Sequence, residues 1–460
     1  MPVLHERVVG MEQSVIEKYG EARLPRYTSY PTAPHFSPEI IPGTYGRWLR
    51  SIPATQTTSL YLHIPFCRSM CWYCGCHTTI TEKDKPILDY LEMLHREVDL
   101  IAKERGGDFN VGEIHFGGGT PTIIEPREFI TLMDALRSTL GFASRVNTAV
   151  EIDPRRLQPE MMDALGRSGV TRASLGVQSF DPKVQKAINR IQSAETTSEC
   201  VTGLRQNGVN AINFDLIYGL PYQTVESCIE TVETAVAMGP DRFSVFGYAH
   251  IPSFKKHQRL INEAALPNAR ERHAQAEAIA QRLVAAGYQR IGLDHFALPE
   301  DELAIAQREG HLHRNFQGYT TDTCETLIGL GASAIGKLGQ GYHQNEVPPG
   351  LYANRVAAGE LPTSKTYGLT TEDRLRADVI ERLMCDFKAD IGALSAAHGF
   401  DPEYLLTGNN ALEALERDGL VRRIDAVVWV DHQHRFVVRA VAAAFDAYLA
   451  GSARTYSTAA

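Results

Sequence analysis

The sequence predicts an α/β fold in which parallel strands, each followed by a helix, form an open or closed barrel. Strand-like runs recur six times between residues 59 and 248, and a helix or a helix-start signal follows each run. Parallel strands joined by right-handed crossovers through helices build such barrels. The pattern changes near Leu369, which predicts a smaller module after the barrel.

The six expected strands are short runs of alternating or continuous apolar residues. They cover residues 60–64, 113–116, 148–152, 172–177, 212–217 and 243–248. In the first run Leu60, Leu62 and Ile64 alternate with polar-tipped residues, and Pro65 then ends the strand. Long helices are expected at residues 87–104 and 270–286, and the apolar, glycine-spaced segment 327–335 is expected to return to the site.

Three regions follow from this pattern. Residues 1–50 are expected to form an N-terminal segment that covers the active site, and residues 51–365 the barrel and its extension. Residues 366–460 are expected to form a C-terminal helical, winged-helix-like domain. Within the first region, residues 24–36 are rich in Pro, Tyr and Thr, which is typical of an extended segment that lies across another surface.

The C-terminal region carries its own signals. Thr370 and Asp373 have the spacing of a capping box, and a further helix is expected over residues 412–420. Alternating runs near residues 426–430 and 436–438 predict a hairpin after these helices. The region has no basic stripe, so packing as a lid over the barrel mouth is favoured over DNA binding.

Four of the eight Cys residues lie between positions 67 and 76, directly after the first strand. Cys67, Cys71 and Cys74 have C-x3-C-x2-C spacing, and such short runs of thiolates bind iron–sulfur clusters. Three thiolates would hold three irons of a [4Fe–4S] cluster and leave the fourth open to S-adenosylmethionine (SAM). Zinc is the alternative, but no second C-x2-C pair or H-x3-H follows. The scattered thiols expected to be buried are Cys200, Cys228, Cys324 and Cys385.

Polar and glycine residues follow the other strands, where the sites of such barrels form. The turn over residues 117–120 (Gly-Gly-Gly-Thr) lets backbone groups approach a ligand closely. Glu151 can accept hydrogen bonds from an ammonium or a ribose, whereas Asp153 is placed to cap the next helix. Asp215 lies in an apolar strand, where an unpaired acid is costly, so it is a candidate functional residue.

Several segments resemble the oxygen-independent coproporphyrinogen III oxidases of the radical SAM superfamily, over nearly the entire chain. The segments are residues 25–31 (PRYTSYP), 63–67 (HIPFC), 74–76 (CGC), 213–221 (NFDLIYGLP), 294–297 (DHFA) and 314–321 (RNFQGYTT). The resemblance implies a partial six-stranded (β/α)6, TIM-like barrel. It also implies oxidative decarboxylation of two propionate side chains of coproporphyrinogen III to vinyl groups, giving protoporphyrinogen IX in haem biosynthesis.

The resemblance assigns roles to individual residues. Cys67, Cys71 and Cys74 would bind the cluster, and the residues that would hold the SAM on it are Tyr61, Gly118 and Glu151. The residues that would line a second SAM are Tyr73, Gly119, Thr120, Gln178, Arg190, Asp215, Ala249 and Ile335. Cys76 is expected to take part in catalysis rather than to bind iron. A fourth thiolate would block the iron that SAM needs.

The alternative function is a haem chaperone of the same superfamily, which binds haem without turning over porphyrinogen. Such chaperones lack the Cys that stands here at position 76, and the segment over residues 26–31 also argues against this reading. The expected partners of an oxidase are coproporphyrinogen III and a low-potential electron donor such as flavodoxin. The cations expected to hold the substrate carboxylates, judged by position in the chain alone, are Arg26, Arg314, and His311 or His313.

Composition sets the outer limits. The chain has 460 residues, of which 43% are hydrophobic and 22% charged, with a net charge of -9. An acidic balance argues against a nucleic-acid partner, which normally requires basic residues in excess. No apolar run is long enough to span a bilayer, and the first residues lack the apolar core of a signal peptide. A cytoplasmic, monomeric protein without membrane contact is therefore expected.

Overall fold

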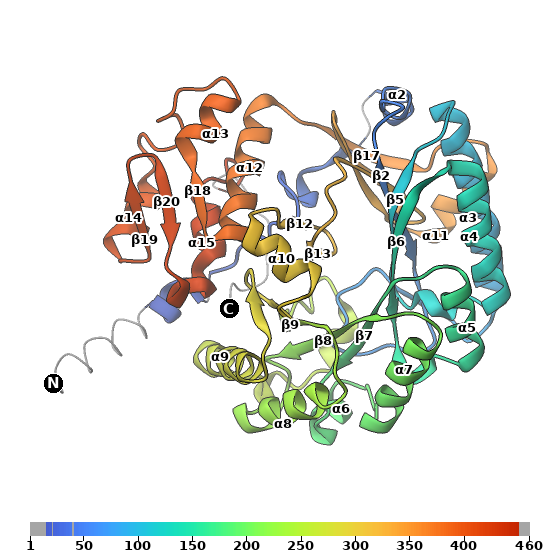
Figure 1. Ribbon diagram of the computed structural model, residues 1–460, viewed down its shortest axis with the longest axis horizontal. Helices are drawn as coiled ribbons and strands as arrows, with labels where there is room; N and C mark the ends of the chain where they lie inside the picture. Colours follow the sequence, from blue (N-terminus) through green and yellow to red (C-terminus); the bar gives the residue numbers. More distant parts are fainter. Residues whose placement is uncertain (1–14, 21, 39–40, 450–460) are drawn as a thin grey trace.

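The computed structural model describes residues 15–20, 22–38 and 41–449, and one large sheet forms its centre (Figure 1). Its parallel strands, in spatial order, are β14 (Thr326–Leu330), β2 (Thr58–Ile64), β5 (Val111–Gly118), β6 (Phe142–Ile152), β7 (Arg172–Gln178), β8 (Ala211–Tyr218) and β9 (Arg242–Gly247). All six predicted strands are therefore confirmed, and β14 adds a parallel neighbour to β2. Each strand is paired with the next along the sheet, so their carboxyl ends meet at one edge.

Antiparallel strands extend both ends of this parallel array. On the β14 side they are β15 (Ile335–Leu338), β16 (Gly341–Asn345), β17 (Thr363–Gly368) and β1 (Ser37–Pro38), and on the β9 side β11 (His295–Ala297) and β10 (Gln289–Ile291). β1 and β10 are the two edges of the sheet. The six predicted barrel strands thus form an arc within a larger open sheet.

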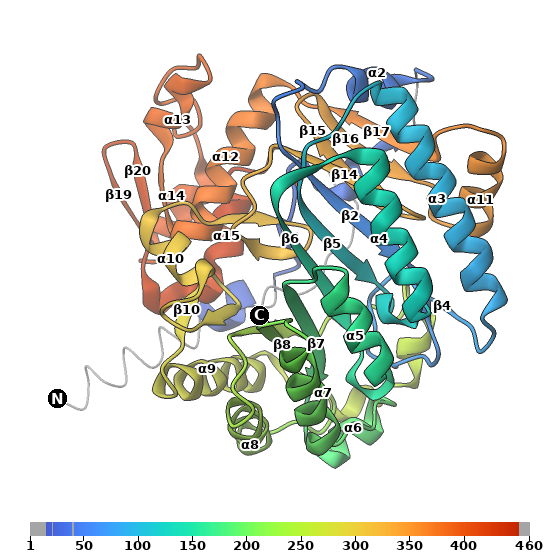
Figure 2. The same cartoon turned by 45° about the vertical axis from the view of Figure 1, so that its right-hand side comes forward.

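Helices cover the outer face of the arc, as Figure 2 shows for α3, α4, α5, α7 and α8. The helices of this part are α2 (Thr44–Arg50), α3 (Lys85–Arg105), α4 (Pro126–Leu140), α5 (Pro159–Arg167), α6 (Pro182–Ala187), α7 (Ala194–Gln206), α8 (Val225–Val236), α9 (Ala269–Ala285), α10 (Glu302–Glu309) and α11 (Pro349–Ala357). Strand residues such as Leu62, Phe116 and Phe214 are completely buried between sheet and helices. Burial of this apolar surface is what drives the helices onto the sheet.

The C-terminal region has a second hydrophobic core and lies beside the large sheet (Figure 1). It contains α12 (Thr371–Asp386), α13 (Ile391–Ala397), α14 (Asn410–Arg417), α15 (Val438–Ala443) and the small sheet β18 (Lys388–Asp390), β20 (Val427–Val430), β19 (Val421–Ile424). The predicted capping box is present, since Thr370 and Asp373 accept hydrogen bonds from each other's backbone N–H.

One predicted element of this region is wrong. The run over residues 426–430 is a strand, but residues 436–438 are helical and β19 takes the place of the second hairpin strand. Asp431 caps the helical turn His432–Val437, and Val438, Val441 and Ala442 of α15 are buried together. Three apolar residues at helical spacing pack against α12, and this packing overrides the local strand propensity of the valines.

The N-terminal segment joins the two parts. Tyr27 and Tyr30 are buried in the core of the C-terminal region, whereas Phe36 stacks on Tyr342 of β16 at a ring-centroid distance of 5.0 Å. The two short pairs β3 (Phe66–Cys67) with β4 (Thr79–Ile80), and β12 (His313–Asn315) with β13 (Gly318–Thr320), complete the strands. None of the helices in the described residues is both long enough and apolar enough to cross a membrane.

Candidate active site

A cavity of about 1160 Å³ lies at the carboxyl ends of the parallel strands. The predicted site residues that line it are Cys67, Cys71, Tyr73, Cys74, Cys76, Gly118, Gly119, Thr120, Glu151, Gln178, Arg190, Asp215 and Ala249. Within the described chain, Tyr61 and Ile335 are not among the lining residues. Tyr61 nevertheless lies close behind the wall, because a Cβ atom added at Gly117 would meet both Tyr61 and Glu151. The fold thus collects residues from six successive strand–helix units.

The Cys loop is tied to the strand from which it emerges. The His63 Nε2 atom lies 3.1 Å from the carbonyl oxygen of His77, and the backbone N–H groups of Thr79 and Thr81 donate to the carbonyls of Pro65 and Cys67. These bonds close residues 65–81 into a loop whose two ends run in parallel as β3 and β4. The three thiols therefore face the cavity from a fixed frame.

The glycine turn packs directly under this loop. Gly119 and Thr120 donate backbone hydrogen bonds to the carbonyls of Ile64 and Phe66, at 2.9 and 2.8 Å. A Cβ atom at Gly119 would lie 2.6 Å from the Phe66 oxygen, and Gly118 adopts a φ of 114° that disfavours other residues. The Thr120 hydroxyl also lies 3.2 Å from the Cys67 sulfur. Glycines are required here because the backbone of the turn touches the strand that leads to Cys67.

Glu151 stands at the end of β6 with its carboxylate in the cavity wall. It accepts a hydrogen bond from the backbone N–H of Gly118 at 3.2 Å and lies 3.2 Å from Nε2 of His115. Burial raises the pKa of Glu151, but the contacts with His115 and Gly118 outweigh burial and lower the pKa below its ordinary value. The side chain is therefore held as an anion that can accept hydrogen bonds from a cationic or hydroxyl-bearing ligand.

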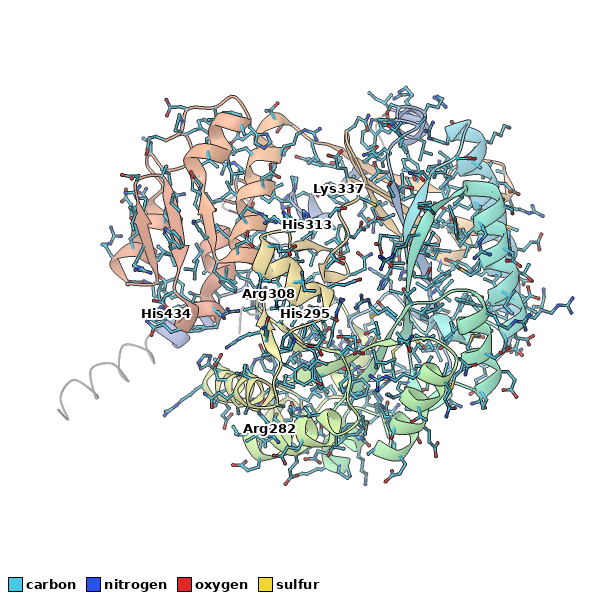
Figure 3. The ribbon with its side chains drawn as sticks, viewed as in Figure 1. Arg282, His295, Arg308, His313, Lys337 and His434 are labelled. Carbon is cyan, nitrogen blue, oxygen red and sulfur yellow. The ribbon has the colours of Figure 1, made fainter. Side chains whose placement is uncertain are left out.

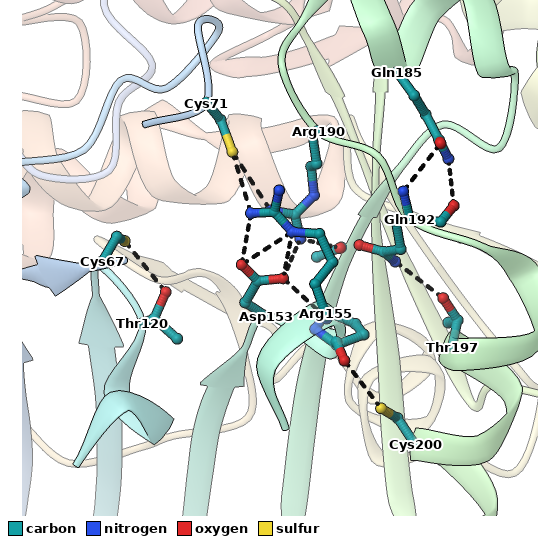
Figure 4. A network of polar contacts seen from close by, with 12 residues as sticks. Cys67, Cys71, Thr120, Asp153, Arg155, Gln185, Arg190, Gln192, Thr197 and Cys200 are labelled. Carbon is teal, nitrogen blue, oxygen red and sulfur yellow. Dashed lines mark hydrogen bonds and ion pairs between the residues drawn. The ribbon is translucent and has the colours of Figure 1, made fainter. Parts of the chain in front are cut away.

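Two arginines that follow β6 and β7 converge on Cys71 (Figure 4). Arg155 and Arg190 place terminal guanidinium nitrogens 3.5 and 3.6 Å from the Cys71 sulfur. Asp153 binds both arginines, at 2.7 and 3.2 Å, and its side chain also caps the turn as predicted. The arginines lower the pKa of Asp153 although burial raises it. Two positive charges thus stabilise negative charge at one thiolate of the Cys loop.

Cys76 has its thiol beside Cys74 rather than beside the other two sulfurs. Its backbone N–H donates to the Cys74 sulfur at 3.4 Å, and a hydrogen bond between the two thiols lowers the pKa of Cys74 to about 6 and raises the pKa of Cys76. The loop after β9 holds this part of the Cys loop, because Lys255 donates to the Cys76 carbonyl at 2.9 Å and His257 lies 2.7 Å from the Cys74 carbonyl.

The far wall of the cavity carries polar groups ready for a ligand. Asp215 accepts hydrogen bonds from Ser174 and Asn213, each at 2.9 Å, and burial raises its pKa to about 6. Gln178 sits at a β-bulge with a φ of 67°. Among the residues that the structure describes, the Gln178 Oε1 and Arg190 Nε atoms are buried without a hydrogen-bond partner. Buried polar atoms of this kind normally meet a partner, which a bound polar ligand would supply.

These residues fit the cofactor that the Cys spacing predicts. A [4Fe–4S] cluster places each thiolate on a different iron, so its ligands do not converge on one point. In the described part of the chain, no group of three or more His, Cys, Asp or Glu side chains is arranged to hold a single metal ion. Cys67, Cys71 and Cys74 line one cavity that has room for a further ligand.

Sequence reasoning missed several residues of this site. Arg155 follows the third predicted strand by three residues, so the rule that inspects the ends of strands could have found it. His115 lies within β5 rather than after its end, so the rule that inspects strand ends does not find it. Lys255 and His257 lie at the short 3-10 helix Lys256–Leu260, and only the folded structure shows that they reach the Cys loop.

Comparison with known proteins defines the class. The family model of the Radical SAM superfamily matches residues 61–235, from β2 into α8. The solved structure of the coproporphyrinogen III oxidase from Escherichia coli, described as a radical SAM enzyme, has a TM-score of 0.88 and 36% identity. The alignment covers 93% of this chain and all of that chain. The fold and the Cys loop are therefore those of a radical SAM protein, whose cofactors are a [4Fe–4S] cluster and SAM.

Curated relatives give the particular family. A protein of Bradyrhizobium diazoefficiens is 58% identical over 439 residues, which cover 95% of this chain and 98% of the relative. A protein of Salmonella typhimurium is 38% identical over 452 residues, which cover 98% of both chains. Both are named oxygen-independent coproporphyrinogen III oxidase. The chain belongs to the family of oxygen-independent coproporphyrinogen III oxidases.

Proposed function

We propose that this protein converts coproporphyrinogen III to protoporphyrinogen IX without oxygen. Each of two propionate side chains loses one hydrogen atom, one electron and CO2, and becomes a vinyl group. The observation that carries the proposal is the single cavity in which three thiols of the Cys loop, the glycine turn and Glu151 come together. The family membership and the 58% identical relative named as an oxidase support the same reaction.

The cofactor would be bound by residues of this chain in defined positions. Cys67, Cys71 and Cys74 would hold the [4Fe–4S] cluster, which together with SAM supplies a 5′-deoxyadenosyl radical. Glu151 and the backbone at Gly118 would receive the amino acid or ribose part of SAM, with Tyr61 behind them. Arg155 and Arg190 would stabilise the negative charge of Cys71 and so of the cluster it binds.

A second SAM molecule would lie along the opposite wall. The orphaned amide oxygen of Gln178 and the orphaned Nε of Arg190 support this placement, together with the buried carboxyl of Asp215. Tyr73, Gly119, Thr120 and Ala249 border the same space. Ile335 lies on β15 and is not among the described residues that line the cavity. It would therefore contribute to this SAM site from outside the cavity wall.

Cys76 would serve the reaction through its proton. Its thiol hydrogen-bonds Cys74, so it stays protonated when Cys74 is a thiolate. A protonated thiol beside the cluster can donate a proton to groups in the cavity. The remaining proposals are a flavodoxin-like, low-potential donor of electrons, a monomeric state, a cytoplasmic location and no nucleic-acid or membrane partner.

The haem chaperone is the alternative that an experiment must separate from an oxidase. The reconstituted protein is titrated with haem and, separately, incubated anaerobically with SAM, a reductant and coproporphyrinogen III. An oxidase consumes coproporphyrinogen III over many turnovers whether or not haem binds. Stoichiometric haem binding without any loss of coproporphyrinogen III would establish the chaperone instead.

A further inference from the structure

A second, smaller cavity of about 80 Å³ adjoins the large one. Both cavities are lined by Arg26 and by residues 246–249 at the end of β9. Arg272 of α9, Arg314 of β12 and Arg439 of α15 complete its wall. We call this space the arginine pocket. It lies where the barrel, the N-terminal segment and the C-terminal region meet.

The lining of the arginine pocket carries an excess of positive charge. Five arginines and two acids are among its lining residues, which leaves three positive charges in excess. One pair is internally matched, since Arg290 contacts Glu277 at 2.8 Å. The second acid, Asp294, lies 2.8 Å from His295 and 3.7 Å from Arg314. Among the described residues that line the pocket, guanidinium groups therefore outnumber carboxylates.

Arg314 is the most constrained of these side chains. Its side chain is only 5% exposed, and one terminal nitrogen donates to the Arg26 carbonyl at 3.5 Å. Of the atoms in the described residues, none accepts a hydrogen bond from its Nε or Nη1. Buried donors without acceptors are costly, and the cost is larger for a charged group. Arg314 therefore has donors that an anion bound in the pocket could satisfy.

The electrostatics of the pocket favour an anion. Burial lowers the pKa of Arg26, and the neighbouring charge of Arg314 lowers it further. Burial and the charge of Arg26 lower the pKa of Arg272 in the same way, and that of Arg439 to about 10. All of these guanidinium groups remain protonated near neutral pH, so they would attract an anion that entered the pocket.

We propose that the arginine pocket binds a carboxylate of a propionate side chain of the substrate while the tetrapyrrole occupies the large cavity. The proposal rests on the proposed function and names the residues that recognise the substrate. Arg26 lines both cavities, and Arg314, which lines the small one, would donate to the carboxylate oxygens. A space of about 80 Å³ is large enough for a small group such as a carboxylate.

The two histidines considered with these arginines lie elsewhere. His311 is 73% exposed beside Glu309. His313, labelled in Figure 3, pairs with Glu381 of α12 at 3.3 Å. Neither is among the described residues that line the two cavities. Of the four cations first chosen by their position in the chain, the structure therefore places Arg26 and Arg314 in the arginine pocket and the two histidines outside it.

The test measures the KM for coproporphyrinogen III in the cluster-loaded enzyme. Arg26→Gln and Arg314→Gln are each expected to raise the KM at least tenfold, with iron content equal to that of the wild type. Arg282→Gln is the matched control, because Arg282 of α9 pairs with Glu233 of α8 at 2.9 Å, away from both cavities. This variant is expected to leave the KM unchanged.

A binding measurement checks the carboxylate directly. The holoenzyme is titrated with coproporphyrin III and with its tetramethyl ester, which lacks the charges. The wild type is expected to prefer the free acid by at least tenfold, and Arg26→Gln to lose most of this preference.

Each outcome has a defined meaning. A folded Arg26→Gln enzyme with unchanged KM and unchanged preference for the acid overturns the inference while the proposed function stands. A wild-type holoenzyme that does not convert coproporphyrinogen III overturns the proposed function itself. If Arg314→Gln does not fold, Arg26→Gln alone decides the test. Arg26 is exposed, so its replacement is expected to leave the fold intact.

Discussion

Arg155 and Arg190 contact the same sulfur atom, although they come from different strand–helix units. Asp153 binds both arginines, and Arg190 also donates to the Gly176 carbonyl at 2.6 Å. This arrangement gives Cys71 a more positive environment than Cys67, whose contact is the neutral hydroxyl of Thr120. Charge of this kind beside a cluster ligand stabilises the extra electron of the reduced cluster, and so raises its reduction potential.

The four Cys residues of the loop are expected to divide into two classes. Cys67→Ser, Cys71→Ser and Cys74→Ser each remove a ligand and are expected to abolish cluster assembly. Cys76→Ser is expected to retain the cluster and lose turnover by at least 100-fold, because we propose that this thiol, which lies beside Cys74, acts in proton transfer and does not bind iron. Iron and sulfide analysis and product formation under anaerobic conditions measure both effects.

Cys324→Ser is the matched control, since Cys324 is half-buried but does not line the described cavity. Full activity of Cys76→Ser would contradict the role assigned to Cys76. It would also remove the main argument from the Cys loop that the protein is an oxidase and not a haem chaperone.

At the scale of elements, the glycine turn after β5 and the Cys loop after β2 form one unit. Two backbone hydrogen bonds join them, and Gly119 leaves no room for a side chain because the Phe66 carbonyl is in the way. Gly119→Ala is expected to displace the Cys loop, lower the unfolding free energy by about 1–3 kcal/mol and reduce the iron content. Thermal unfolding and iron analysis report these changes.

Gly107→Ala is the control, because it also replaces a glycine with alanine but at a position where the added methyl group has room. A Cβ atom there meets nothing within 4 Å among the described atoms. Equal melting temperatures and iron contents in the two variants would contradict the close packing at Gly119.

A buried acid links α3 to the strands on the β14 side. Glu97 accepts hydrogen bonds from the Gly331 backbone, Asn345 and Tyr352, at 2.6 to 2.7 Å. Burial nevertheless raises its pKa from 4.5 to about 7. Between these pH values the folded protein holds a proton that the unfolded chain releases, so stability falls as the pH rises through this window.

This linkage predicts a pH dependence that one substitution removes. From pH 5 to pH 8, the unfolding free energy of the wild type is expected to fall more steeply than that of Glu97→Gln. The shift from 4.5 to about 7 corresponds to roughly 3 kcal/mol over the whole window. Denaturant titrations at several pH values give both curves. Parallel curves would show that Glu97 does not titrate in this range.

The elements also show what the sequence can predict. The six parallel strands could be predicted from their apolar runs. A parallel strand is buried on both faces, so nearly all of its residues are apolar. The valines over residues 436–438 fit a strand equally well, and only packing on α12 makes them helical. Similarly, β14 could not be placed beside β2 from its own sequence, since pairing between distant segments leaves no local pattern.

The same limit applies to the site. Cys67, Cys71 and Cys74 are adjacent in sequence, so their spacing alone predicts a cluster. The arginine pocket draws on segments almost the whole chain apart, from Arg26 to Arg439. An arginine is common on any surface, and only the fold distinguishes one that faces a cavity.

At the scale of the whole molecule, the N-terminal segment connects the barrel to the C-terminal region. The Tyr27 hydroxyl donates to Asp446 at 3.0 Å, and the Tyr30 hydroxyl accepts from the Ala447 backbone at 2.9 Å. Leu24, Pro25, Arg26 and Pro34 of the same segment line the large cavity. The C-terminal region therefore acts on the site by positioning this segment, and its own Arg439 lines the arginine pocket.

Loosening this connection is expected to expose the segment without unfolding the protein. Tyr27→Phe removes the hydrogen bond to Asp446, which is worth about 1–2 kcal/mol when one partner stays buried. Amide hydrogen exchange over residues 22–36 is expected to become several-fold faster, while exchange in β5 and β6 stays unchanged. Tyr404→Phe serves as the control because that side chain is exposed. Unchanged exchange over residues 22–36 in Tyr27→Phe would contradict this account of the segment.

The central claim is that three thiols, the glycine turn and Glu151 form one catalytic cavity for coproporphyrinogen III. Mass analysis of the porphyrinogen recovered after anaerobic incubation with SAM, a reductant and the reconstituted protein tests it most directly. The account predicts protoporphyrinogen IX, with the mass of two CO2 and four hydrogen atoms lost in all as two propionates become vinyl groups. Unaltered coproporphyrinogen III from protein that carries a full cluster and bound SAM would contradict it.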